Sequence, residues 1–289
     1  MSALGASLRS LKWCLNDQVT TTPIAAFNGL ISKQFQPNLK LSNEERQSSA
    51  GDHLLFFNFP QNAELSPDGY FDYQTPKSIL KNENLWFKRR MWASGTMQFV
   101  SSLQVDRHYH CHETVRFVKP LKNDYYVGIN RQVLDAESNL PVVNELRTLV
   151  YTQNLPSTPS AQVGWETPDF DEPNIHSTQL TFEDCDIFRY SALTYNSHRV
   201  HWDRAYCRNI EGYKDVIVQG PYMVHAILKY MQFGLGLSVS DIKYKNTHNL
   251  YPGQKVDIDA SQKLATQWDV EIRDTNSRRV YCKASVGVK

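Results

Sequence analysis

Residues 188–203, FRYSALTYNSHRVHWD, place amide, imidazole and carboxylate side chains within a few positions of one another. The groups belong to Asn196, His198, His201 and Asp203. After them, Gly220-Pro221 has the sequence of a helix start, because proline fits the first turn. Such a polar cluster before a helix N-terminus can transfer a proton beside a developing oxyanion. An ordinary surface loop has the same composition, so spacing alone leaves both interpretations open.

Helices are predicted on both sides of this stretch. Apolar spacing indicates one helix over residues 182–193 and a second over 221–232, which Gly234 and Gly236 end. A third is predicted over residues 23–35, where threonines precede a proline. The chemistry-bearing stretch therefore connects two helices.

Strands are predicted in two separate parts of the chain. Apolar alternation indicates an antiparallel meander over residues 96–153 and four further strands over 239–245, 255–260, 266–273 and 280–286. Residues 152–177 between them contain prolines at 156, 159, 168 and 173 among Ser, Thr and Asn, which is typical of a linker.

The two halves repeat the same order, a short helix followed by a meander. This order predicts an α+β architecture in which each antiparallel sheet packs on its own helix, as an intramolecular pseudo-dimer. We place an N-terminal segment at residues 1–19, an N-terminal unit at 20–155, a linker at 156–178 and a C-terminal unit at 179–289.

Composition excludes several classes of protein. The 31 basic and 30 acidic residues give a net charge of +1, which does not favour wholesale nucleic-acid binding. No apolar run is long enough for a membrane span. The five scattered cysteines show no metal or disulfide spacing. Leu4, Leu8, Leu11 and Leu15 lie at helical spacing near Arg9 and Lys12, as in a mitochondrial targeting segment or an ordinary amphipathic helix.

The motifs resemble those of a known family. Residues 188–203, followed by IVQGP at 217–221, resemble the hydratase motif of the MaoC-like (R)-specific hydratases and dehydratases. WFKRRMWASGTMQF, within residues 85–99, resembles a stretch of the double hot-dog members. The similarity is greatest to the fungal mitochondrial 3-hydroxyacyl-thioester dehydratases, with mesaconyl-CoA hydratases as relatives. The resemblance implies the double hot-dog fold.

The resemblance also implies site residues. The family motif has a catalytic Asp five residues before a catalytic His, then a helix that opens with a Gly. His201 and Gly220 occupy the His and Gly positions, but Asn196 replaces the Asp, and His198-Arg199 replaces Asn-Pro. Position 196 therefore offers no carboxylate to act as a base.

The reaction implied is the reversible dehydration of 3-hydroxyacyl thioesters. An imidazole at His201 can take the α-proton and return it to the leaving hydroxyl. The amide near Gly220 can stabilise the thioester oxyanion, and the Asn196 side chain can hold the hydroxyl. Supporting roles are open: Asp203 can orient an imidazole or serve the surface, Arg199 can contact phosphate or form a salt bridge, and His198 can be structural.

Further expectations follow from the resemblance. The substrate is carried on acyl-carrier protein or CoA in the mitochondrial matrix, no cofactor or metal is required, and the protein is a monomeric pseudo-dimer or a homodimer. Charge alone suggests that the carrier arm enters past Lys88, Arg89, Arg90, Lys243 and Lys245. His108, His110 and His112 alternate as on one strand face, but no fourth zinc ligand is evident. Two alternatives remain, a branched dicarboxylyl-CoA hydratase and a non-catalytic thioester-binding subunit.

Overall fold

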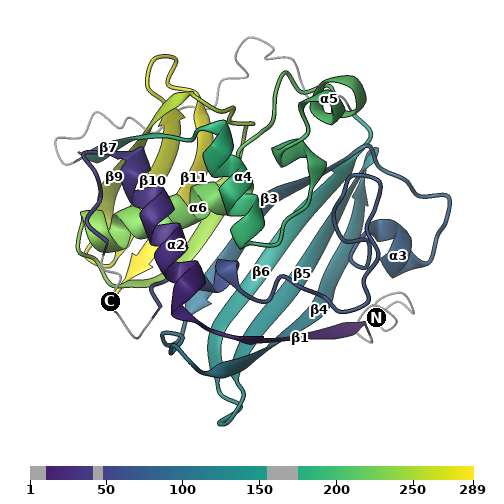
Figure 1. The fold of residues 1–289 in the computed structure, drawn as a ribbon, viewed down its shortest axis with the longest axis horizontal. Coiled ribbons are helices and arrows are strands. Elements are labelled where there is room, and N and C mark those ends of the chain that lie inside the picture. Colours follow the sequence, from purple (N-terminus) through teal and green to yellow (C-terminus); the bar gives the residue numbers. More distant parts are fainter. Residues whose placement is uncertain (1–10, 42–47, 155–174) are drawn as a thin grey trace.

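One antiparallel sheet of 11 strands organises the computed structural model, which describes residues 11–41, 48–154 and 175–289. Figure 1 shows the strands curving behind a layer of helices. From edge to edge they are β1 (Lys12–Gln18), β4 (His108–Leu121), β5 (Asp124–Asp135), β6 (Pro141–Thr152), β3 (Arg89–Phe99), β8 (Val239–Asn246), β11 (Val280–Val288), β10 (Gln267–Asp274), β9 (Lys255–Leu264), β7 (Ile175–Thr181) and β2 (Phe35–Gln36).

The two predicted halves join through β3 and β8. These strands pair antiparallel from Ser94 opposite Lys245 to Gln98 opposite Asp241. The backbone hydrogen bonds of both edge strands are thereby satisfied, which removes two exposed edges. The predicted α+β fold class is confirmed, with the two sheets continuous.

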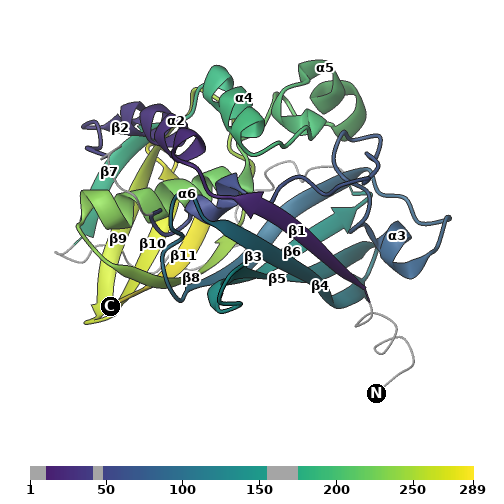
Figure 2. The same ribbon diagram turned by 60° about the horizontal axis from the view of Figure 1, so that its bottom comes forward.

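The long helices lie together on one side of the sheet, and the short helix α3 (Pro76–Leu80) lies apart from them near β4 (Figure 2). The long ones are α2 (Thr21–Ile31), α4 (Asp184–Leu193) and α6 (Gly220–Lys229), and they confirm the three predicted helices. Residues 222–229 of α6 are all buried, so this helix is the centre of the core. The short segments are η1 (Ser32–Gln34), η2 (Asp52–Leu55), α3 (Pro76–Leu80), η3 (Arg199–His201), α5 (Arg204–Tyr206), η4 (Cys207–Glu211) and η5 (Tyr230–Gly234).

The position of α2 differs from the prediction that each sheet packs on its own helix. The Phe27 ring lies 5.6 Å from that of Tyr190 on α4 and 3.9 Å from that of His225 on α6, measured between centroids. Helix α2 therefore packs against helices of the C-terminal half.

Buried charged groups explain why an irregular segment, and not α2, covers the N-terminal part of the sheet. Arg131 is 1% exposed and binds Glu113 at 2.7 Å and Glu145 at 3.1 Å. A guanidinium N–H of Arg131 also donates to the Phe57 carbonyl at 2.7 Å, and Glu113 accepts from Tyr73. Buried charges need polar partners. The irregular segment around residues 52–75 supplies them, whereas the apolar face of a helix would not.

A buried ion cluster holds this segment to α6. Asp52 is inaccessible to solvent, and its carboxylate lies 2.9 Å from the Lys229 ammonium and 3.0 Å from His225. Burial alone raises the pKa of Asp52, but Lys229 and His225 outweigh it and hold that pKa well below its ordinary value. The cluster connects the N-terminal half to the central helix.

Two predicted boundaries require correction. The spacing of Leu11 and Leu15 predicted a helix, but residues 12–18 form β1, paired with β4; Leu4 and Leu8 lie outside the described residues. The linker was predicted to reach residue 178, but β7 begins at 175 and pairs with β9. Pairing across the sheet outweighs local propensity in both places. The remaining domain boundaries stay predictions.

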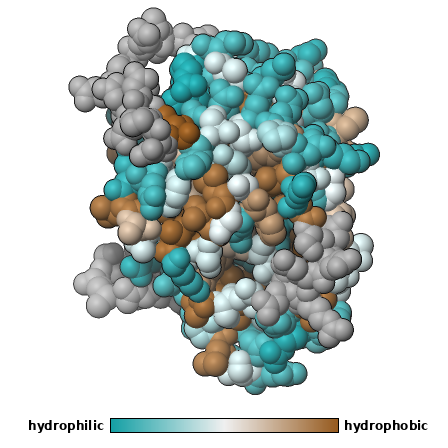
Figure 3. Space-filling view, turned by 90° about the vertical axis from the view of Figure 1, so that its left-hand side faces the viewer, coloured by the Kyte–Doolittle hydropathy of each residue, from teal (hydrophilic) through white to brown (hydrophobic). Residues whose placement is uncertain are grey.

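The face at the β7 and β9 edge is not uniformly polar. Figure 3 shows hydrophobic residues gathered across the middle of this face, with hydrophilic residues around them. In the described part of the chain, no helix has the length and apolar character needed to cross a membrane.

Candidate active site

Gln219 fixes the end of α4 beside the start of α6. Its side chain is fully buried, and Nε2 donates to the Ile187 carbonyl at 2.8 Å and to the Ser191 hydroxyl at 2.8 Å. Both acceptors belong to α4. Because Gln219 directly precedes Gly220, the polar stretch after α4 is held near the N-terminus of α6.

His201 is oriented by the backbone of the residues just before Gln219. The Ile217 N–H donates to the Val200 carbonyl at 3.0 Å, and Nδ1 of His201 lies 2.8 Å from the Ile217 carbonyl oxygen. A carbonyl oxygen only accepts, so Nδ1 carries the hydrogen and Nε2 has a free lone pair. Nε2 has no hydrogen-bond partner among the described residues.

Burial keeps the His201 imidazole neutral. The residue is 8% exposed, and loss of solvation lowers its pKa to about 4, although the Ile217 carbonyl opposes that shift. At neutral pH, Nε2 is therefore an unprotonated base with a fixed direction. This is the state that abstraction of an α-proton requires.

Gly220 begins α6, and its close contacts explain the residue type. A Cβ at this position would lie 2.5 Å from Nδ2 of Asn246 and 3.3 Å from Cβ of Trp92. Asn246 Nδ2 donates to the Trp92 carbonyl at 2.9 Å, which fixes it there. In the described part of the chain, no acceptor binds the Gly220 N–H. The helix N-terminus thus presents a free amide with partial positive charge.

Asn196 is anchored through both its backbone and its side chain. Its N–H donates to the Ser191 carbonyl at 2.8 Å, and its Oδ1 accepts from the His198 N–H at 3.1 Å. The side-chain NH₂ has no partner among the described residues. Asn196 can therefore donate to a ligand, but it cannot act as a base.

His198 has partners that the sequence did not indicate. Its Nε2 lies 3.5 Å from a carboxyl oxygen of Asp68 and 3.9 Å from one of Glu211. The ring is edge-on to His201, with centroids 5.4 Å apart. Asp68 comes from an aperiodic loop and Glu211 follows the motif without any recognised spacing. Neither residue had a signal beyond its residue type.

Asp203 and Arg199 bind each other rather than an imidazole. Their ion pair spans 2.7 Å, and the Asp203 carboxylate also accepts from the Tyr206 N–H at 2.9 Å, which caps α5. The contacts do not support the prediction that Asp203 orients a histidine. They give both residues a local structural role.

The predicted basic entrance is not formed as expected. Arg90 is buried and binds Asp68 at 2.7 Å, and Arg89 is buried with its Nε donating to the Glu211 carbonyl at 2.9 Å. Lys243 instead lines a groove of about 940 Å³ on the N-terminal part of the sheet. The prediction is therefore wrong for Arg89 and Arg90, which are buried, and it stays a prediction for Lys88 and Lys245.

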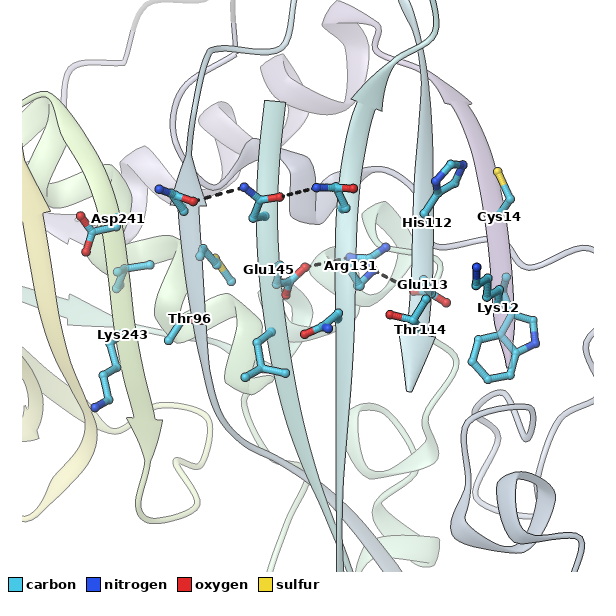
Figure 4. Close-up of a pocket in the computed structure, with 18 residues that line it drawn as sticks. Lys12, Cys14, Thr96, His112, Glu113, Thr114, Arg131, Glu145, Asp241 and Lys243 are labelled. Carbon is cyan, nitrogen blue, oxygen red and sulfur yellow. Dashed lines mark hydrogen bonds and ion pairs between the residues drawn. The ribbon is translucent and has the colours of Figure 1, made fainter. Parts of the chain in front are cut away.

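The groove lies on the sheet face away from the helices (Figure 4). Amide side chains of Gln98, Asn144 and Gln132 join in a ladder across it. Its lining includes His112 but none of Asn196, His198, His201 or Gly220. Among the described residues, no group of three or more His, Cys, Asp or Glu side chains is arranged to hold a metal.

Known proteins with similar sequences identify the family of this chain. The sequence model of hydroxyacyl-thioester dehydratase type 2 matches residues 51–252. The mitochondrial hydroxyacyl-thioester dehydratase type 2 of Saccharomyces cerevisiae is 31% identical over 96% of this chain and 99% of its own length. The mesaconyl-C(4)-CoA hydratase of Chloroflexus aurantiacus is 24% identical over 66% of this chain and 75% of its own.

Solved structures agree on the fold. A MaoC-like dehydratase from Phytophthora capsici superposes with a TM-score of 0.69 at 12% identity, covering 98% of this chain and 97% of its own. HtdX of Mycobacterium tuberculosis gives a TM-score of 0.67 at 12% identity, covering 96% and 99%. The expected double hot-dog fold is confirmed, and the chain belongs to the hydroxyacyl-thioester dehydratase type 2 family.

Proposed function

We propose that this protein reversibly dehydrates 3-hydroxyacyl thioesters to trans-2-enoyl thioesters. The observation that carries the proposal is His201, whose Nδ1–H is bound to the carbonyl of Ile217, three residues before α6 begins, while the unprotonated Nε2 is left free. A fixed neutral base close to a free helix N-terminus suits removal of a proton next to a thioester carbonyl.

The residues divide the reaction between them. The thioester oxygen accepts from the Gly220 amide, which stabilises the enolate-like charge as Nε2 of His201 takes the α-proton. The electron pair of the C–H bond becomes the new C=C bond as the β C–O bond breaks. The same imidazole returns the proton to the departing hydroxyl, so water leaves and His201 is neutral again. Asn196 donates from its NH₂ group to that hydroxyl.

Related proteins support the substrate class and the location. The relatives from Saccharomyces cerevisiae and Schizosaccharomyces pombe are both named as mitochondrial hydroxyacyl-thioester dehydratases type 2. We accordingly propose that this chain acts in the mitochondrial matrix, in type II fatty-acid synthesis, on acyl groups carried by acyl-carrier protein or CoA. A monomeric pseudo-dimer or a homodimer is the proposed assembly.

Charge pairing leaves few buried cations for the dicarboxylyl-CoA alternative. A second carboxylate on the substrate would need a cation of its own in the site. The buried guanidinium groups of Arg90, Arg131 and Arg147 each bind a carboxylate at 2.7 Å. Their charge is already neutralised by Asp68, Glu113 and Glu145. Arg89 differs, because its Nε donates to the Glu211 backbone carbonyl and its buried Nη2 has no hydrogen-bond partner in the described part of the chain.

The test is hydration of a trans-2-enoyl thioester by the purified full chain, followed by loss of the enoyl absorbance. We expect turnover by the wild type and almost none by His201→Ala. The exposed His112 serves as the matched control, since His112→Ala should keep the wild-type rate. Retention of more than about a tenth of the rate by His201→Ala would exclude the assignment. Thioester binding without any turnover by the wild type would indicate a non-catalytic subunit.

A further inference from the structure

A second set of titratable groups surrounds His198. Asp68 comes from the N-terminal half, and Glu211 ends the π-helical segment η4. Their carboxyl oxygens lie 3.5 and 3.9 Å from Nε2 of His198. π-Helical turns are frequent at functional sites. These two carboxyl groups approach the motif whose own carboxylate position is occupied by Asn196.

Glu211 is enclosed without ordinary partners. It is 0% exposed, and neither of its carboxyl oxygens accepts a hydrogen bond; Nε2 of His198 is likewise buried and unpaired. The hydroxyl of Tyr206 lies near Glu211 and opposes the rise of its pKa on burial, but it does not reach full hydrogen-bond geometry. Unsatisfied polar atoms in a core are rare and costly, and they often mark functional sites. Two of them face each other here.

We propose that Glu211 is a positioning residue that acts through His198 in the dehydration reaction. As a neutral carboxylic acid it donates to Nε2 of His198, which confines the ring hydrogen to Nδ1. A small change in a Glu211 torsion closes the 3.9 Å separation to a hydrogen bond. Nδ1–H then joins Asn196 as a donor to the β-hydroxyl. The inference rests on the proposed function.

Asp68 cannot take this role. Its carboxyl oxygens accept two guanidinium N–H groups from Arg90, at 2.7 and 3.3 Å, so they serve as acceptors and not as donors. An ionised carboxylate would instead accept a hydrogen bond from Nε2–H. The lone pair of the ring would then be on Nδ1, which is the opposite tautomer. Asp68 is also nearer to His198 than Glu211 is, so the tautomer decides between the two arrangements.

Burial gives this arrangement a pH dependence. Loss of solvation raises the pKa of Glu211 to about 8, so its acid form predominates at neutral pH. Above that value Glu211 ionises, Nε2 becomes the donor, and the Nδ1 donor is lost. The groups that face Glu211 or His198 from the surrounding elements are Asp68, Tyr70, Arg89, Arg90, His201, Tyr206, Cys207 and Tyr213.

The first test compares the pH profiles of kcat for wild type, Glu211→Gln and the exposed control Glu64→Gln. In wild type and control, kcat should fall with a midpoint near pH 8 and level off at a lower rate, because Asn196 still donates to the hydroxyl. A glutamine amide donates at every pH. Glu211→Gln should therefore keep its neutral-pH rate and lose the alkaline decline. An unchanged alkaline decline in Glu211→Gln would overturn the inference, because a purely structural role would not remove it.

The second test needs no variant of Glu211. The ¹⁵N shifts of His198, assigned by comparison with His198→Gln, should show hydrogen on Nδ1 at pH 7 and its transfer to Nε2 with a midpoint near 8. Hydrogen on Nε2 throughout would assign control of the ring to Asp68 and refute the role of Glu211. Absence of dehydratase activity in the wild type would refute the proposed function instead, so the two failures are distinguishable.

Discussion

Substitution of Gly220 by alanine should remove most of the activity through one steric contact. The new Cβ would stand 2.5 Å from Nδ2 of Asn246, which must retreat by about 1 Å to reach ordinary contact. That movement breaks the hydrogen bond to the Trp92 carbonyl, at a cost of about 1 kcal/mol. If Asn246 stays in place, the start of α6 must move instead.

Movement of α6 displaces the proposed oxyanion donor. Loss of one such donor costs about 2.7 to 4 kcal/mol of transition-state stabilisation, or roughly 100- to 1,000-fold in kcat. KM should change little, because the oxyanion develops only in the transition state. The assay is steady-state hydration of an enoyl thioester, with thermal unfolding as a check on folding.

A double substitution tests whether the clash with Asn246, and not the loss of glycine itself, lowers the rate. In the double variant Gly220→Ala with Asn246→Ala, the 2.5 Å contact is absent. The Trp92 atoms, 3.3 Å from the new Cβ, need to move by only a few tenths of an ångström. We expect kcat to recover at least tenfold over Gly220→Ala, which corresponds to a coupling energy of about 1.4 kcal/mol. A wild-type kcat in Gly220→Ala would show that Asn246 retreats while α6 stays in place, and it would refute the steric argument. A double variant no faster than the single one would refute it as well.

The remaining predictions concern acid–base state and stability. Because the neutral form of His201 is the base and its pKa is lowered to about 4, kcat/KM should persist as pH falls and decline only near pH 4; an acid limb near 6.5 would contradict this. Asp203→Ala should cost about 1 kcal/mol of urea stability through the lost cap while kcat stays within about threefold, and a dead enzyme would reveal a catalytic role. Asp52→Ala leaves the buried Lys229 without its carboxylate and should lower the free energy of unfolding by about 3 to 5 kcal/mol; a loss below 1 kcal/mol would refute the importance of the cluster.

The helices and strands could be predicted because their patterns are local. Helix α6 has Pro221 in its first turn and an apolar sequence before Gly234, and the structure places a helix there. The four strands after residue 238 alternate with turn residues between them, as observed. Strand β7 was missed because its pairing with β9 does not depend on its own periodicity.

The motif between residues 188 and 221 determined the family and three candidate residues, Asn196, His201 and Gly220, because these side chains are close in sequence and their chemistry is specific. Only the tertiary structure shows that Asp68 and Glu211 lie beside His198 and that Arg89 and Arg90 are buried. It also shows that α2 packs against the C-terminal half. Those outcomes depend on contacts between distant segments and on the cost of burying charge without a partner, and neither is visible in the order of residues.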